Sequence, residues 1–142
     1  MVNWLLMALP LSTIAGLLPT INKLTLCLKG GNFDPKLGRD NLQASKAGLD
    51  TENFAKIIRC ANAESNFYEN WPVYAAGVLA VNFTPGVPRL ACLGLAYGWI
   101  GARIFYNGFY IYDKARLRTP AFMVATTISY ALLVTAGLNS TF

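Results

Sequence analysis

Long apolar stretches, separated by shorter polar ones, run through this chain. Residues 10–22, 71–88 and 119–142 contain no Lys, Arg, Asp or Glu. Each of them lies in a segment close to the roughly 17–25 residues that a membrane-spanning helix needs. The pattern predicts four spans within one membrane domain of residues 1–142, and their approximate limits are 2–20, 54–83, 90–112 and 120–138.

Turn-forming residues separate the predicted spans. The first span is expected to close near Pro19, and the polar segment after it contains a Gly-Gly pair and an Asp-Pro pair, which are typical of irregular loops. Thr51 gives a capped start to the long second helix, whose first half is polar. Pro120 is tolerable in the first turn of the last helix. The predicted loops are 21–53, 84–88 and 113–119.

Composition supports a membrane protein. The 142 residues suffice for one domain, 54% of them are hydrophobic, only 13% are charged, and the mean hydropathy is +0.38. A soluble domain carries about 25% charged residues, so this chain lacks the groups that keep a surface in contact with water. The predicted fold class is an all-α integral membrane protein, a four-transmembrane-helix bundle.

The distribution of the cations predicts an orientation. The net charge is +5, and ten of the twelve Lys and Arg residues lie in or beside loops 21–53 and 113–119. An even number of spans places these two loops on the same side, and the positive-inside rule makes that side cytoplasmic. The cations flank apolar spans and form no basic run with interleaved aromatics, so we expect no nucleic-acid partner.

Metal and histidine chemistry is disfavoured by residue content. The sequence has no histidine, and its three cysteines, Cys27, Cys60 and Cys92, form neither a CxxC pair nor a disulfide framework. We therefore expect no metal site and no histidine-based catalytic triad.

Two polar stripes lie on predicted membrane helices. Four residues of the second helix are spaced by three, four and three positions, which places them within a sector of roughly 80° on one helix face. Four residues of the third helix are also close in angle. The stripes are Arg59, Asn62, Asn66 and Glu69, and Arg103, Tyr106, Asn107 and Tyr110. Such groups suit a zwitterionic ligand, because a carboxylate binds an ammonium and guanidinium groups bind carboxylates.

A structural role is the alternative for these residues. Polar side chains within spans often form hydrogen bonds between helices. For Arg103, pairing with Glu69 inside the bundle is as plausible as a ligand contact. The second-helix stripe as a whole favours a site, because it begins at the basic loops as a water-accessible pocket would.

Three motifs resemble those of a known family. The run RCANAESNFYENWPVY at 59–74 resembles the second-helix signature of the MAPEG family, the membrane-associated proteins in eicosanoid and glutathione metabolism, in which an Arg precedes Asn-x-x-Glu and then x-x-Pro. The run GARIFYNGFY at 101–110 resembles its Arg-x-x-Tyr-x-x-x-Tyr pattern, and LRTPAF at 117–122 resembles its Leu-Arg-Ser stretch. Asn62 departs from the pattern, since many members carry another Arg there.

The resemblance implies a site for reduced glutathione between adjacent subunits of a homotrimer. Glu69 would bind the γ-glutamyl ammonium, and Arg118 would stabilise the thiolate. Arg116 is the alternative to Arg118, because the preceding loop varies in length. The implied glutathione-binding residues are Arg59, Asn62, Asn66, Glu69, Arg103, Tyr106 and Tyr110, and the implied catalytic residues are Tyr110 and Arg118.

The function implied by this resemblance is a glutathione-dependent transferase or peroxidase. Glutathione would be the co-substrate, and a hydrophobic electrophile or lipid hydroperoxide would enter from the membrane lipid. The enzyme would lie in the endoplasmic reticulum or a similar membrane, with its site facing the cytoplasm. The alternative is a non-catalytic relative that binds a lipid and presents it to a partner enzyme. A transporter is disfavoured, because it would need a polar path through the membrane. The half of the spans farther from the basic loops is apolar apart from Asn82.

Overall fold

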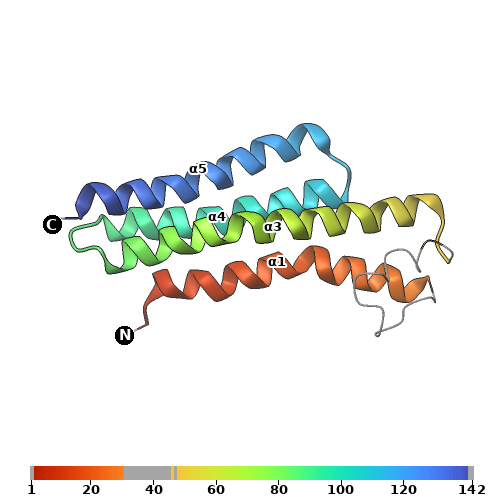
Figure 1. Ribbon diagram of the computed structural model, residues 1–142, viewed down its shortest axis with the longest axis horizontal. Helices are drawn as coiled ribbons and strands as arrows, with labels where there is room; N and C mark the ends of the chain where they lie inside the picture. The colour runs from red at the N-terminus through yellow and green to blue at the C-terminus, as the bar shows by residue number, and fades with distance from the viewer. Residues whose placement is uncertain (1, 31–45, 47, 141–142) are drawn as a thin grey trace.

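The chain forms a bundle of long helices that run up and down in turn (Figure 1). A computed structural model describes residues 2–30, 46 and 48–140. Within these residues the helices are α1 (Trp4–Lys29), α3 (Thr51–Phe83), α4 (Arg89–Ile111) and α5 (Ala115–Asn139). Most of the predicted first loop, 31–45 and residue 47, lies outside the described residues.

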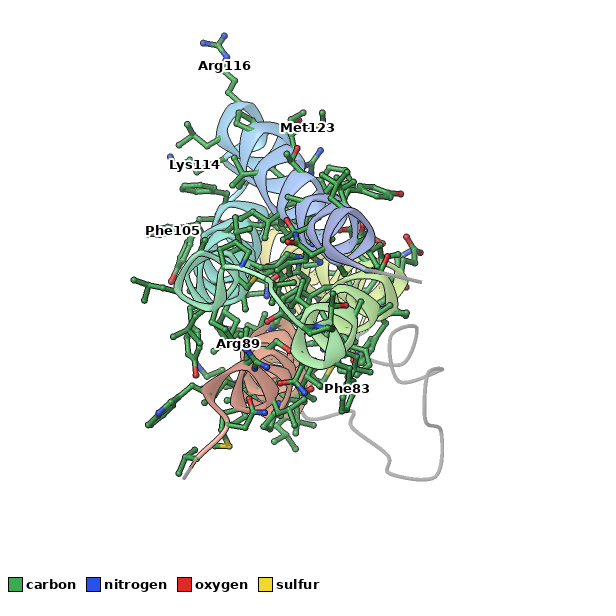
Figure 2. All side chains as sticks on the ribbon, turned by 90° about the vertical axis from the view of Figure 1, so that its left-hand side faces the viewer. Phe83, Arg89, Phe105, Lys114, Arg116 and Met123 are labelled. Carbon is green, nitrogen blue, oxygen red and sulfur yellow. The ribbon has the colours of Figure 1, made fainter. Side chains whose placement is uncertain are left out.

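The bundle has two ends of different character. Both chain termini and the α3–α4 turn lie at one end, which we call the terminal end (Figure 1). The α4–α5 turn, the last residues of α1 and the first residues of α3 lie at the other, which we call the basic end because most cations of the chain gather there. Helices α1 and α5 lie on opposite sides of the α3–α4 pair in both views (Figures 1 and 2).

Aromatic packing holds α3 and α4 together. Trp99 of α4 is fully buried, and the ring of Tyr74 stacks on it with centroids 3.9 Å apart. The Tyr74 hydroxyl donates a hydrogen bond of 3.1 Å to the carbonyl of Ala96, which satisfies the buried phenol. Phe67 lies edge-on to Trp99 and also faces Gly16 of α1, where an added Cβ would come within 2.4 Å of the ring. Helix α1 can therefore approach this cluster closely only because residue 16 is glycine.

The outer surface is apolar. Large hydrophobic side chains such as Phe83, Leu90, Val134 and Leu138 are more than half exposed. Helices α1 and α5 are long and apolar enough to cross a membrane by length and composition. An apolar surface of this extent would be costly in water and is suited to lipid.

Helix α1 is longer than the sequence predicted. Its end was expected near Pro19, but the helix continues to Lys29. A proline lacks the N–H that would bond to the carbonyl four residues earlier, here that of Ala15. The side chain of Asn107 on α4 donates to this carbonyl at 3.3 Å, so the freed group is satisfied and the helix passes Pro19 without a break.

Helix α5 also begins earlier than expected. Residues 115–119 were predicted as loop, but the helix starts at Ala115, and the amides of Leu117 and Arg118 donate to the carbonyl of Lys114. A tight turn precedes it, in which Asp113 has a positive φ of 56°. Arg116 and Arg118 therefore lie on the first turn of a helix and not in a loop, which fixes their directions relative to α4.

Candidate functional site

The second-helix stripe lies along α3 and divides into two edges. At about 100° per residue, Arg59 and Asn66 lie within roughly 20° of each other, and Asn62 and Glu69 lie farther round the helix. Arg59 and Asn66 are half-buried and face the rest of the bundle, whereas Asn62 and Glu69 are exposed on this protomer. The structure therefore brings half of the predicted stripe into the bundle and leaves the other half on its outer surface.

Arg103 of α4 contacts the inward-facing half of the α3 stripe. Its side chain is fully buried, and its Nη1 donates a hydrogen bond of 3.2 Å to the Oδ1 of Asn66. Three aromatic rings surround the guanidinium, with centroids 4.7 Å away for Tyr106, 5.5 Å for Phe67 and 5.6 Å for Trp99. Cation–π contacts of this kind stabilise a charge that has left water. The alternative pairing of Arg103 with Glu69 is wrong for this conformation, since Asn66 is the partner.

Two tyrosines connect Arg103 to the basic end. The ring of Tyr106 lies edge-on to that of Tyr110, with centroids 5.6 Å apart. The guanidinium of Arg118 on α5 lies over the Tyr110 ring at 4.4 Å. A continuous row of contacts thus runs from Asn66 through Arg103, Tyr106 and Tyr110 to Arg118, across three helices.

Arg118 and Arg116 differ in direction. Arg118 is half-buried against Tyr110, while Arg116 is exposed and extends away from the bundle (Figure 2). Only Arg118 of this pair contacts the row of polar and aromatic side chains described above.

Arg59 has a partner that the sequence analysis missed. Its Nη1 lies 3.9 Å from the Oδ2 of Asp113, in the turn after α4. The carboxylate is mostly exposed, and the Nε of Arg59 is buried without a partner among the described residues. The long ion pair therefore leaves hydrogen-bonding capacity on this guanidinium. The charged turn at 113–119 was the available signal, but spacing within α3 could not connect it to Arg59.

A second missed cluster lies on the opposite side of α3. Glu64 accepts a hydrogen bond of 2.9 Å from the Thr20 hydroxyl and forms an ion pair with Lys23. At about 140° from Arg59, Glu64 faces α1 and is separate from the stripe. Thr20 and Lys23 share a face of α1, which was the signal in the sequence, but Lys23 was expected to lie in loop 21–53.

Asn107 belongs to the helix packing and not to the row. Its Nδ2 bonds to the carbonyl of Ala15, and its Oδ1 is buried without a partner among the described residues. The third-helix stripe is therefore divided. Its members Arg103, Tyr106 and Tyr110 belong to the row that begins at Asn66, whereas Asn107 contacts the backbone of α1. No group of three metal-ligating side chains is found in residues 2–30, 46 and 48–140.

Comparison of the sequence with known families shows which family the chain belongs to. A sequence model of the MAPEG family matches residues 5–138, nearly the whole chain. The chain belongs to the MAPEG family. No curated protein matches it, and no solved structure matches it.

Membership of MAPEG confirms the resemblance seen in the three motifs. The family consists of membrane helix bundles and includes glutathione-dependent enzymes, lipid-metabolism proteins and non-catalytic members. The two long apolar helices of this MAPEG protein agree with that membrane location.

Proposed function

We propose that this MAPEG protein is a glutathione-dependent transferase or peroxidase that acts on hydrophobic electrophiles or lipid hydroperoxides in its membrane. One observation carries the proposal: the row of contacts from Asn66 through Arg103, Tyr106 and Tyr110 to Arg118. It joins hydrogen-bonding groups to the guanidinium of Arg118 at the basic end of the bundle.

The exposed edge of α3 supports a site shared between subunits. Glu69 and Asn62 lie on the outside of the protomer. Glu69 has no ion-pair partner among residues 2–30, 46 and 48–140, and a carboxylate without a partner is unfavourable against lipid. A neighbouring subunit covering this edge, as in the proposed homotrimer, would enclose both residues. Glu69 would then bind the γ-glutamyl ammonium of glutathione, and Arg59 would bind a carboxylate.

Arg103 acts indirectly in this proposal. Because its side chain is fully buried, glutathione reaches it in this conformation only through its neighbours. Its hydrogen bond orients the amide of Asn66, and its charge holds the ring of Tyr106. Arg103 and the buried Tyr106 are therefore positioning residues, and Asn66 and Tyr110 are the groups that would face the ligand.

Arg118 would supply the chemistry. A thiol with a pKa of about 8.5 is mostly protonated at neutral pH, and a nearby guanidinium favours the thiolate. With an electrophile, the thiolate sulfur forms a bond to carbon and the leaving group departs with the electron pair. With a lipid hydroperoxide, the thiolate sulfur attacks the terminal oxygen and the O–O bond breaks, which leaves glutathione as the sulfenic acid. The lipid alkoxide that departs takes a proton from water and becomes the alcohol. A second glutathione then converts the sulfenic acid to the disulfide and water.

Glutathione titration of the purified protein in detergent tests this function. We expect an ultraviolet thiolate absorbance near neutral pH that Arg118→Ala removes and Arg116→Ala retains, because Arg116 extends away from the row (Figure 2). We expect Glu69→Gln to weaken glutathione binding by roughly tenfold or more, the loss typical of a hydrogen bond to a charged group. Glu52→Gln, an exposed change in the first turn of α3, is the matched control.

The alternative function is binding of a lipid that is presented to a partner enzyme. The row of contacts from Asn66 to Arg118 favours the enzymatic function over lipid binding, because its polar groups would make no specific contact with an apolar ligand. If the wild-type protein binds no glutathione at millimolar concentration, the enzyme proposal is refuted. If it binds glutathione without forming thiolate, the role given to Arg118 is wrong.

A further inference from the structure

The terminal end of the bundle has a groove that plays no part in the proposed glutathione chemistry. It is open, has a volume of about 560 Å³, and lies between the start of α1 and the start of α4. Its apolar walls are Val2, Trp4, Leu5, Leu90 and Leu93. Most of this lining faces outward: Leu90 is 83% exposed and Trp4 is 59% exposed. The groove is thus accessible from the surrounding lipid.

A single cation stands at the rim of this groove. Arg89 is exposed, and its Nη2 makes one long hydrogen bond of 3.4 Å to the carbonyl of Asn82. This contact directs the guanidinium to the α1 side of the bundle, as Figure 2 shows from this end. The other N–H groups of an arginine fork remain available to a ligand. Asn3 is already committed, since it donates to Asn82 and accepts from the amide of Leu6.

The charge of Arg89 has no acidic side chain to balance it at this end. The sequence contains no Asp or Glu in residues 1–33, 70–112 or 114–142. Arg89 is also the first residue of α4, where the helix dipole opposes a cation, and α4 has no side-chain cap. The groove therefore combines apolar walls with a positive charge at its rim that no Asp or Glu side chain at this end neutralises.

The depth of the groove matches the lipid headgroups. Trp4 and Arg89 each begin a helix at the terminal end of the bundle, and both line this groove. Tryptophan favours the boundary between lipid and water, and arginine at a helix end reaches the same boundary. A molecule in the groove would have its polar part at Arg89 and its apolar part along α1 and α4.

We propose that this groove binds an acidic phospholipid, whose phosphate pairs with Arg89 and whose acyl chain lies between Trp4 of α1 and Leu90 of α4. The planar guanidinium binds two phosphate oxygens at once, which an ammonium cannot do. This site is separate from the glutathione site and lies at the opposite end of the bundle, so it stands whether or not the proposed function is right.

Fluorescence quenching in vesicles tests the proposal at the groove itself. The full-length protein is reconstituted in phosphatidylcholine vesicles with either brominated phosphatidic acid or brominated phosphatidylcholine at the same mole fraction. Trp4 is the exposed tryptophan, whereas Trp99 is fully buried and Trp71 is half-buried with its Nε1 bonded to Ser12. The signal lost in Trp4→Phe is therefore the signal of the groove.

We expect phosphatidic acid to associate with the Trp4 site about fivefold more strongly than phosphatidylcholine. This ratio is the gain in affinity for an anionic headgroup that one Arg or Lys near the membrane surface typically provides. Arg89→Gln should reduce this ratio to about one. Arg116→Gln, the same change at the basic end, should leave it at about fivefold. Far-ultraviolet circular dichroism confirms that each variant is folded.

Three results would overturn the proposal. Equal quenching by the two lipids in the wild type would show that the groove does not select an acidic headgroup. Weak quenching by both, in protein that is folded, would show that another copy of the chain covers Trp4. Displacement of the brominated lipid by soluble glycerol phosphate would show a simple phosphate site in which the acyl chain has no part.

Discussion

The passage of α1 through Pro19 makes a testable prediction about Asn107. Pro19 cannot donate to the carbonyl of Ala15, and the side chain of Asn107 donates to it from α4 at 3.3 Å. We predict that Asn107→Leu destabilises the protein by about 1 kcal/mol. Polar bonds between membrane helices are typically worth about 0.6–2 kcal/mol. The value lies within this range because the carbonyl is buried and is otherwise left without a donor.

The contribution of this hydrogen bond can be separated from the change in packing by a second substitution. Pro19→Ala restores an N–H that bonds to the Ala15 carbonyl within α1. In that background the loss of Asn107 no longer leaves the carbonyl unsatisfied. The penalty for Asn107→Leu should therefore fall by about 1 kcal/mol, and this difference is the coupling energy of the pair.

Reversible unfolding in mixed micelles, followed by circular dichroism over a titration with dodecyl sulfate, measures these free energies. Asn139→Leu is the matched control, because its Nδ2 bonds within α5 to the carbonyl of Thr135. The penalty for this control should be the same with Pro19 and with Ala at residue 19. An equal penalty for Asn107→Leu in the two backgrounds would refute the explanation, since Asn107 would then stabilise the protein by something other than the freed carbonyl.

Two further predictions concern charged groups near the basic end. Glu64→Gln should destabilise the protein more than the double change Glu64→Leu with Lys23→Met, because the single change leaves Lys23 half-buried without its carboxylate; the same micelle titration compares them. Asp50 caps α3, and not Thr51 as predicted, because its side chain accepts from the amide of Asn53. The hydrogen bonds from the backbone amide and then the side chain of Asn53 lower the pKa of the Asp50 carboxyl. Because the pKa of Asp50 is lower in the folded than in the unfolded state, the cap stabilises α3 fully at a pH above the unfolded-state pKa, and this stabilisation is lost as the pH falls through the folded-state pKa. Hydrogen-exchange protection of the first turn of α3 should decrease over that pH range. Asp50→Ala should abolish this pH dependence.

The helices could be predicted because their signal is local. An apolar pattern of sufficient length indicates a membrane helix whatever it packs against, and Thr84 to Pro88 interrupt the pattern visibly. The continuation of α1 beyond Pro19 could not be predicted in this way. The group that satisfies the carbonyl freed by Pro19 is the side chain of Asn107, which lies 92 residues after that carbonyl in the sequence.

The candidate site was predicted as a set but not as an arrangement. The spacing along α3 places its four stripe residues within a sector of roughly 80°. A rotation of α3 about its axis by half that angle would change which of these residues face α4. The structure turns Asn66 inward to Arg103 and leaves Glu69 outside. The partners of Arg59 and Glu64 were missed because Asp113 and Lys23 lie on other segments of the chain, and the spacing of residues within α3 carries no information about them.

The pairing of charged groups in this bundle itself favours the exposed edge of α3 as the ligand side. Inside the protomer, Lys23 is neutralised by Glu64. Arg103 donates one hydrogen bond to Asn66 and lies against three rings, while its Nε and Nη2 have no partner among the described residues. A charged group inside a membrane bundle needs such contacts, because a charge exposed to lipid is costly. Glu69 lies in the same bundle but on its outer surface. A carboxylate that served only the fold would face inward, so its outward position supports a role toward a neighbouring subunit and the cationic end of a ligand.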